Sequence, residues 1–352
     1  MDALITLPFV TPDLPGTGGI AKVVPEDFRV DEVPAYLPCG EGEHTYLRVE
    51  KRGRNTREVV QDLARLLHVS EREAGVAGQK DRHALTTQWV SFAGIAPEQA
   101  LGLEGEGFRV LEARRHGNKL RTGHLRGNRF EIRLRGVGPD GLDRARAVAA
   151  ALADRGLANF YGPQRFGRFG DNAEVGRLLL LGADDPRVRR VRDRTQRRFL
   201  ISAFQSEVFN RVLAERVADG SWAHPLVGDV LQKLPSGGLF VCEDPATDDP
   251  RVASFEVSIT GPMPGRKVRP APRGAPAEQE ERVLAATGVS GEHLARSADA
   301  EGARRVLRLP VALDVREDAD GLVLSFELPP GAYATVVLRE ITKGELPPGL
   351  EA

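Results

Sequence analysis

The stretch NRFEIRLRGV, residues 128–137, alternates apolar and charged side chains with a period of two. Its apolar face consists of Phe130, Ile132 and Leu134, and its charged face of Arg129, Glu131, Arg133 and Arg135. Alternation of this kind is typical of a β-strand, because successive side chains point to opposite faces of a sheet. The stretch therefore predicts a strand, and it is the clearest strand signal in the chain.

Further strand patterns lie on both sides of this stretch, near the two ends of the chain. The sequences are FRVDEV (28–33), HTYLRVEK (44–51), TTQWVSF (86–92), LVLSFELP (322–329) and YATVVLRE (333–340). Each is a short run rich in β-branched or aromatic residues, which favours strands. The sequence thus predicts sheet structure at both ends of the chain.

Helical signals lie between and beside these strands. A helix is predicted from Asn55, because Glu58 completes a capping box, and Ser70 with Glu73 repeats that start signal. Residues 198–218 form a strongly amphipathic pattern whose apolar face is Ile201, Phe204, Val208, Val212 and Leu213. The proline-rich and glycine-rich residues 261–276 predict a loop, and an acidic helical stretch follows to about residue 305.

The order of these patterns predicts the domain organisation. A chain of 352 residues exceeds the usual size of a single core, so two domains are expected. Strand-rich ends enclose a helical middle, which indicates a mixed α/β domain interrupted by an insertion. The sequence contains no internal repeat.

Composition excludes several classes of protein. No uncharged apolar run approaches the roughly 20 residues that a membrane helix needs, and the N-terminus has an acid at position 2 and no basic region. Cys39 and Cys242 lie outside any CxxC pattern, and the seven histidines lack ligand spacing such as HExxH. We therefore expect no metal site, no membrane association and a cytoplasmic location.

The net charge of −1 hides segregated clusters of basic residues. Residues 109–135 contain nine Lys or Arg against two Glu, residues 187–198 contain seven Arg against one Asp, and residues 44–57 contain five basic side chains. Any single cluster fits a solvated surface, but three clusters in which Arg outnumbers Lys favour contacts with phosphates. A polyanionic partner is expected, and the pattern does not separate DNA from RNA.

The stretch VAGQKDRHALTTQWVSF, residues 76–92, places Asp81 between Lys80 and Arg82. Gly, Gln, Lys and Asp are common in surface loops, so one interpretation is a solvated turn. The other interpretation is that Asp81 is an ionised carboxylate that attacks a substrate. The residues of this stretch alone leave both interpretations open.

Five stretches that occur in order across nearly the whole chain decide between them. They are GTGGIAKVVPEDFRVDEVP (16–34), AGQKDRHALTTQW (77–89), LRGNRF (125–130), NFYGPQRFG (159–167) and SFELPPGAYATVVLRE (325–340). Together these stretches closely resemble the TruD family of tRNA pseudouridine synthases. A single motif such as GNRF is a weak signal, whereas five in the same order are specific.

The resemblance implies a fold, a substrate and a domain division. The implied fold class is α/β (α+β), with a pseudouridine-synthase catalytic domain built on a mixed, mainly antiparallel sheet and a family-specific α/β insertion domain. The implied catalytic domain is discontinuous, residues 1–155 and 307–352, and the insertion is residues 156–306. The implied target is uridine 13 of tRNA, with tRNA as the partner; no protein partner is implied.

The resemblance also implies that Asp81 is the catalytic nucleophile. Isomerisation of uridine breaks the N-glycosidic bond and rejoins the base through carbon without a cofactor, and an ionised carboxylate can assist either at the base or at the sugar. A stacked base partly desolvates the carboxylate, so a cation must keep it charged. In an extended segment Lys80 and Arg82 point away from Asp81. Lys22 is the preferred partner, although a purely structural lysine there is equally consistent.

The substrate contacts that the resemblance implies are Phe28, Asn128, Phe130 and Phe326. A flat ring can stack on a base lifted out of the RNA, and an amide can pair with the edge of uracil. All three phenylalanines could instead be core residues, and Asn128 could serve a turn. Periodicity does not distinguish these roles, and the resemblance alone favours the substrate role.

Three alternatives to this function remain. The protein could modify another RNA site, it could be a tRNA-binding or RNA-chaperone protein without catalysis, or it could cleave the glycosidic bond without rejoining it. The intact Asp81 argues against the second alternative, and release of free uracil would identify the third.

Overall fold

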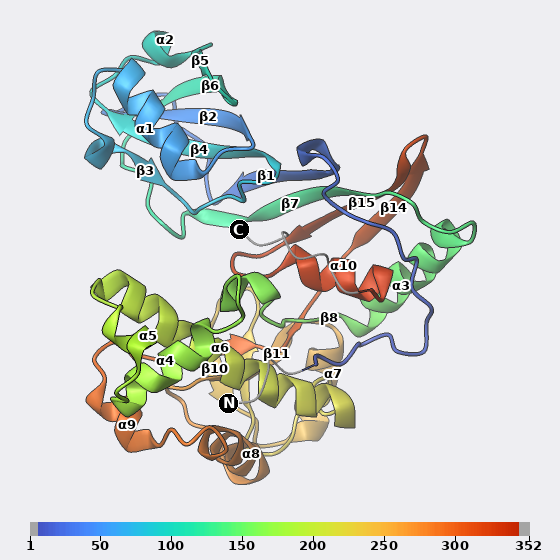
Figure 1. Ribbon diagram of the computed structural model, residues 1–352. Helices are drawn as coiled ribbons and strands as arrows, with labels where there is room; N and C mark the ends of the chain where they lie inside the picture. Colours follow the sequence, from blue (N-terminus) through green and yellow to red (C-terminus); the bar gives the residue numbers. More distant parts are fainter. Residues whose placement is uncertain (1–5, 345–352) are drawn as a thin grey trace.

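The computed structural model describes residues 6–344 (Figure 1). Its larger sheet has nine strands in the order β14-β15-β7-β1-β4-β2-β6-β5, with β3 paired to β4. Their bounds are β1 (Phe28–Pro34), β2 (His44–Arg52), β3 (Gly75–Val76), β4 (Leu85–Ala93), β5 (Glu104–Gly105), β6 (Phe108–His116), β7 (Leu125–Leu134), β14 (Leu313–Asp318) and β15 (Gly321–Leu328). Among the described strands of this sheet only β1 and β4 pair in parallel. The predicted mixed, mainly antiparallel sheet is confirmed.

Strand β7 lies in the middle of this sheet, between β1 and β15. Its apolar side chains face the core as predicted: Ile132 and Leu134 are fully buried. The strand begins three residues earlier than the pattern indicated and ends at Leu134. The early end has a local cause, because Gly136 has a φ of 67°, a left-handed conformation that turns the chain out of the strand.

Helices cover the sheet in two groups. The first group lies over β2, β4 and β6, where Val59 and Leu63 of α1 pack against Leu47 and Val49; it contains α1 (Thr56–Leu66) and α2 (Pro97–Ala100). The second group packs on β7 and β15 and contains α3 (Gly141–Arg155) and α10 (Ala334–Thr342). Short 3-10 turns η1 (Pro25–Asp27) and η2 (Glu71–Glu73) precede β1 and β3. Helix α1 has the predicted capping box at Asn55 and Glu58, whereas Ser70 caps only the turn η2.

The prediction of a strand at residues 333–340 is wrong. These residues form helix α10, in which Val337 and Ile341 are fully buried and lie one turn apart. The β-branched run favours a strand locally, but the same residues also give an apolar helical face. Packing of that face against the core that includes α3 overrides the local preference.

The middle of the chain forms a second layer with its own sheet, shown in green to orange in Figure 1. Its four strands have the order β10-β9-β11-β12. Their bounds are β9 (Val230–Lys233), β10 (Leu239–Val241), β11 (Val257–Met263) and β12 (Ala303–Val306), and the accompanying elements are η3 (Pro163–Phe166), α4 (Asn172–Leu181), α5 (Pro186–Arg189), α6 (Arg194–Asp219), α7 (Pro245–Ala253), α8 (Gly274–Ala285) and α9 (Gly291–Arg296). The 26-residue α6 contains the predicted amphipathic segment.

Two expectations for this region need correction. The loop expected over residues 261–276 is shorter, because its first residues belong to β11 and its last to α8. The acidic stretch to residue 305 is helical only in α8 and α9 and ends in strand β12. Pairing with β11 explains the strand, since Thr260 and Val306 are register partners.

The chain passes between the two layers at two adjacent points. Strand β8 (Leu157–Ala158) and strand β13 (Arg308–Leu309) pair antiparallel, with Leu157 opposite Leu309. The predicted division at residues 155/156 and 306/307 falls next to these strands and stays a prediction. Apolar contacts continue across it, because Phe209 and Leu213 of α6 belong to the same core cluster as Ile132.

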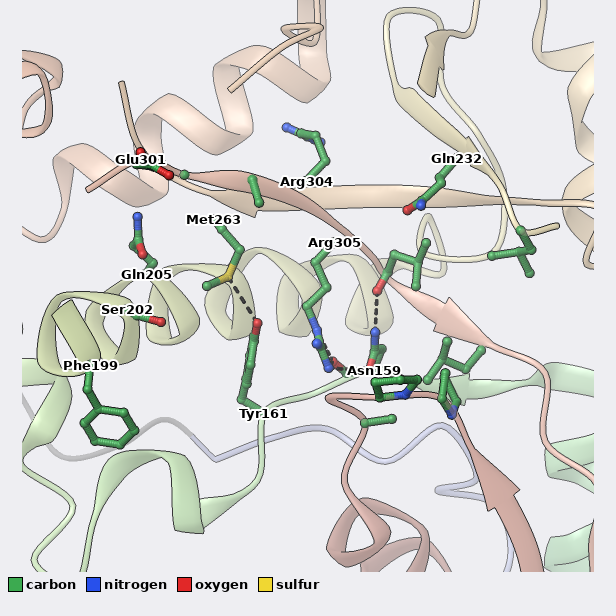
Figure 2. Close-up of a pocket in the computed structure, with 18 of the residues that line it drawn as sticks. Asn159, Tyr161, Phe199, Ser202, Gln205, Gln232, Met263, Glu301, Arg304 and Arg305 are labelled. Atoms are coloured by element: carbon green, nitrogen blue, oxygen red, sulfur yellow. Dashed lines mark hydrogen bonds between the residues drawn. The ribbon is translucent and has the colours of Figure 1, made fainter. Parts of the chain in front are cut away.

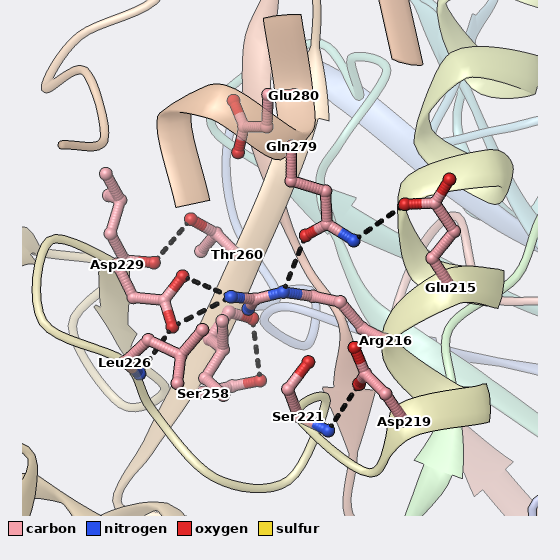
Figure 3. Close-up of polar contacts among 12 residues, drawn as sticks. Glu215, Arg216, Asp219, Ser221, Leu226, Asp229, Ser258, Thr260, Gln279 and Glu280 are labelled. Carbon is pink, nitrogen blue, oxygen red and sulfur yellow. Dashed lines mark hydrogen bonds and ion pairs between the residues drawn. The ribbon is translucent and has the colours of Figure 1, made fainter. Parts of the chain in front are cut away.

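A buried polar cluster holds the second layer together (Figure 3). Arg216 of α6 donates from Nη2 to both carboxylate oxygens of Asp229, at 2.8 and 3.0 Å, and both side chains are almost fully buried. The second oxygen of Asp229 also accepts from the backbone N–H of Leu226 at 2.8 Å, and Arg216 Nε donates to Gln279. The cluster ties α6, the loop before β9 and α8 together.

Candidate active site

Asp81 lies in the loop between β3 and β4, with a side chain that is 17% exposed. One carboxylate oxygen, Oδ1, accepts from the backbone N–H of His83 at 2.8 Å. The other, Oδ2, accepts from Lys22 Nζ in an ion pair. The carboxylate is therefore oriented by two donors and still reaches solvent.

Lys22 is held in this position by the backbone and by an aromatic ring. Its φ is 59°, and its side chain is only 6% exposed. Its ammonium also lies 4.1 Å from the centre of the Phe28 ring, a cation–π contact. The pairing of Lys22 with Asp81 that the sequence suggested is thus present, and its role in catalysis stays a prediction.

The lysine next to Asp81 turns the other way. Lys80 Nζ donates to Glu32 Oε2 at 2.7 Å, and both side chains are buried. The backbone N–H of Lys80 donates to Thr56 Oγ1 at 3.0 Å, and Thr56 donates to Gln88. These contacts fix the loop to the start of α1 and to strands β1 and β4.

Lys51 supports the same loop from beneath, and the sequence analysis did not identify it. Its side chain is 1% exposed, and Nζ donates to the carbonyl oxygens of Asp81 at 2.6 Å and Arg54 at 2.8 Å. Burial lowers the pKa of Lys51 to about 8, and the charge of Asp81 partly opposes that shift. A signal existed in the sequence, because Lys51 continues the apolar face of Leu47 and Val49.

Three of the predicted base contacts form one aromatic group. The rings of Phe130 and Phe326 stack with centres 5.2 Å apart, and Phe28 meets Phe130 edge-on at 6.2 Å. The register explains this, because Phe130 is paired with Phe326 on β15 and with Val30 on β1. All three rings are at least 93% buried in the present structure and belong to the main core. They pack as core residues, and contact with a base stays a prediction.

Asn128 lies two residues before Phe130 on the same face of β7, nearer to the start of the strand. Its register partners are Glu32 and Leu328. Its side-chain oxygen Oδ1 is buried and has no hydrogen-bond partner among residues 6–344. Buried acceptors are rarely left unpaired, so this oxygen can accept a further hydrogen bond. Contact of Asn128 with a substrate stays a prediction.

The basic clusters contain both paired and unpaired cations. In residues 109–135 several arginines are neutralised by acids: Arg109 by Glu50, Arg129 by Glu327, Arg133 by Asp318 and Arg135 by Asp27. In residues 187–198, Arg190, Arg192 and Arg198 are exposed and make no ion pair within the part of the chain that the structure describes. Residues 109–135 also keep cations without an ion pair in the described residues, namely Arg115, Lys119, Arg121 and Arg126. Each cluster therefore retains charge that is available for phosphate contacts.

Residues 6–344 offer neither a cluster of metal ligands nor a membrane-spanning helix. They contain no group of three or more His, Cys, Asp or Glu side chains placed to hold a metal ion. No described helix is both long and apolar enough to cross a membrane.

Comparison with known proteins identifies the family. The family model for tRNA pseudouridine synthase D (TruD) matches residues 6–191 and 188–341. The chain belongs to the TruD family. A tRNA pseudouridine synthase D of Anaeromyxobacter sp. (strain Fw109-5) is 57% identical over 344 residues, 97% of each chain. One of Thermus thermophilus is 45% identical over 98% of this chain and 94% of its own.

The fold agrees with a solved TruD structure as well. The putative tRNA pseudouridine synthase D (TruD) from Methanosarcina mazei matches with a TM-score of 0.78 and 25% identity over 99% of this chain and 98% of that one. The predicted TruD resemblance and the predicted fold class are therefore confirmed. Within this TruD fold, Lys22 contacts both Asp81 and Phe28. Phe130 contacts both Phe28 and Phe326.

Proposed function

We propose that this protein converts uridine 13 of tRNA to pseudouridine and that Asp81 is its nucleophile. The observation that carries the proposal is the Asp81 carboxylate, which is oriented by Lys22 and the His83 N–H and remains partly exposed. Membership of the TruD family supplies the tRNA substrate class. The proposed catalytic domain is residues 1–155 and 307–352, with residues 156–306 as the insertion, and the proposed location is the cytoplasm.

The carboxylate has the chemistry that the reaction requires. The glycosidic bond of uridine must break, the base must turn, and its C5 must join the ribose where N1 left. Asp81 can stabilise this sequence by adding to the base or by attacking the sugar carbon, and both routes need a charged carboxylate. Lys22 places a cation directly against it. The proposal requires no cofactor.

The base is proposed to enter between the carboxylate and the aromatic group. Phe28, Phe130 and Phe326 provide flat apolar surface, and base–aromatic stacking contributes about 1 to 3 kcal/mol per base. Asn128 offers an unpaired oxygen that can accept from the N3–H of uracil. Because the rings are buried in the present packing, side-chain movement must accompany entry of the base.

Release of tritium from tRNA labelled at C5 of uracil tests the proposal. Joining C5 to the ribose expels the C5 hydrogen, so isomerisation releases tritium without freeing the base. We expect tritium release from a tRNA with uridine at position 13 and none when that position is cytidine. Mapping of the modified nucleotide then identifies the site.

The same assay separates the alternatives. Tritium release with modification at another position would show a pseudouridine synthase whose target is not uridine 13. Free uracil would indicate cleavage without rejoining. Binding of tRNA with neither product would indicate a non-catalytic tRNA-binding protein, and each of these outcomes contradicts the proposal as stated.

A further inference from the structure

A large pocket lies beside helix α6, and none of the proposed catalytic residues lines it (Figure 2). Its volume is about 890 Å³, near the upper end for pockets that bind small organic groups. We call it the α6–β12 pocket. Its walls are α6, β12, the residues around 159–161, the end of β9 and the loop 329–332 after β15.

The pocket combines an aromatic ring with amide groups. Phe199 is 43% exposed although it is a large apolar side chain, and Arg165 stacks on it at 5.0 Å. Gln205 donates its amide to Pro264 O at 2.7 Å, and its side-chain oxygen has no partner in residues 6–344. The amide of Gln232 makes only a long contact of 3.4 Å, to Gly237 O. A ring and two amides with spare hydrogen-bonding capacity suit a nucleobase, which has a flat face and a polar edge.

The two arginines inside the pocket have different partners. Arg305 donates to Asn159 and to Gly331 O and lies 4.1 Å above the Tyr161 ring. Arg304 is paired with Glu280. Arg305 has no carboxylate partner in the described residues, but its donors are directed to Asn159 and Gly331. The carboxylates of Asp299 and Glu301 also line the pocket and would repel a phosphate. The interior therefore suits an uncharged group better than a phosphate.

The entrance is different, because it carries unpaired positive charge. Arg198 lines the pocket next to Phe199, and Arg190 and Arg192 precede it at the start of the same arginine cluster. All three are exposed and lack ion pairs in the described chain. Of these three, Arg198 lines the pocket. An unpaired arginine in the wall fits a nucleotide whose phosphate stays outside while its base enters.

The pocket is joined to the proposed uridine site by strand β15. Phe326 pairs with Phe130 and Leu328 pairs with Asn128. The next residues, Pro329 and Pro330, line the α6–β12 pocket. The pocket therefore begins directly after the strand that carries Phe326.

We propose that the α6–β12 pocket binds a second nucleobase of the RNA substrate, turned out of the stack, at a position other than the target uridine. The proposal rests on the proposed function in taking tRNA as the ligand and Asp81 as the site of the target uridine. Two bases held on either side of β15 fix the register of the RNA, so the pocket determines which uridine reaches Asp81.

A scan with abasic nucleotides tests this. We would prepare tRNA transcripts that lack one base at a time around the target and measure their equilibrium dissociation constants at fixed salt, with the wild-type protein and with Phe199→Ala. For wild type we expect one position besides the target at which loss of the base weakens binding about fivefold to a hundredfold, the range for stacking of one base. With Phe199→Ala that loss should shrink to less than about twofold.

Phe169→Ala is the matched control. Phe169 is 83% exposed, has Arg168 against its ring and does not line the pocket. It should leave the effect of the abasic position unchanged. Gln232→Ala, on the opposite wall, should reduce the loss of affinity at the same abasic position as Phe199→Ala does. Agreement between the two variants would show that the result does not come from misfolding of one of them.

The proposal is overturned if no such position exists, or if Phe199→Ala weakens binding of every abasic RNA by the same factor. The binding measurement does not depend on turnover. Absence of tritium release would contradict the proposed function alone, whereas tritium release without this coupling would contradict the second base site alone.

Discussion

Asp81 and Asp229 are both aspartates paired with a cation, yet their surroundings differ. Asp229 is 2% exposed, and its two oxygens accept three hydrogen bonds from Arg216 and Leu226. Asp81 is 17% exposed, and each oxygen accepts one bond, from Lys22 or from His83. A carboxylate with its acceptor sites filled stabilises a fold, whereas one with open sites and solvent access can react. The same kind of ion pair thus leaves one carboxylate enclosed and the other open to a ligand.

The largest effect is expected from Asp81→Asn. The amide keeps the shape but is a poor nucleophile, so tritium release should fall by about a thousandfold or more, as for other essential catalytic groups. The affinity for tRNA should stay within a few-fold, because little contact area changes. Single-turnover rates and equilibrium binding check this. Substantial turnover by the Asp81→Asn variant, in a preparation free of wild-type protein, would show that Asp81 is not the nucleophile.

Asp229→Asn, the identical chemical change, should act on stability. Removing one partner of a buried pair leaves Arg216 uncompensated, which costs about 3 to 5 kcal/mol. Denaturant unfolding measures this loss, and turnover of the folded protein at low temperature should stay within a few-fold of wild type. If Asp229→Asn lowered turnover and left stability intact, the contrast between the two aspartates would fail.

Lys51 extends the comparison, because it is a buried cation that holds the Asp81 loop. Its pKa is about 8 in the folded protein and near 10.4 in an unfolded chain. Between these values the unfolded chain binds more protons, so this group makes the unfolding free energy rise with pH. Relative to Lys51→Met, wild type should gain about 2 to 3 kcal/mol from pH 8 to 10.5.

Activity should respond in the opposite direction over the same range. Loss of the proton from Lys51 weakens the charged hydrogen bond to the Asp81 carbonyl and loosens its loop, so wild-type turnover should fall above about pH 8. Denaturant melts and rates measured on the same samples check both trends. A stability difference between wild type and Lys51→Met that is flat from pH 7 to 10.5 would contradict the assignment.

The smallest effect is expected at the arginine cluster. Arg190→Gln with Arg192→Gln should reduce the slope of log affinity against log salt by about 1 to 2, and it should weaken binding to different RNAs alike. Arg187 and Arg189 are paired with Asp185 and Asp184, so the double change to Gln there is a matched control with a smaller effect. Equal salt slopes for the two double variants would show that Arg190 and Arg192 are solvated and make no phosphate contact.

The sequence predicts the elements whose pattern is strictly local. Strand β7 and the capped start of α1 follow from alternation and from a capping box, and both are present. The sequence does not predict helix α10, because its valines have a local preference for a strand. They form a helix only because that helix packs in the core. Where a sequence fits both a strand and a helix, tertiary contacts decide which one forms, and local preference does not.

The site was predicted through resemblance more than through pattern. Asp81 and Lys22 are 59 positions apart, and no periodicity links them. Glu32 and Lys51 each continue an apolar face of a strand, and a charged residue in that place indicates a buried partner. The identity of that partner, Lys80 for one and two backbone carbonyls for the other, depends on the tertiary structure.

The position of β7 between β1 and β15 also has a consequence for synthesis on the ribosome. Arg129 and Glu327, neighbours across β7 and β15, are 198 positions apart, so β7 emerges long before its second partner. Until then one edge of the growing sheet has unpaired backbone groups, which can pair with another chain. The charged residues Arg129, Glu131 and Arg133 lie along that edge strand. Nascent chains that carry Arg129 and Arg133 should aggregate less than chains in which these two arginines are replaced by threonine.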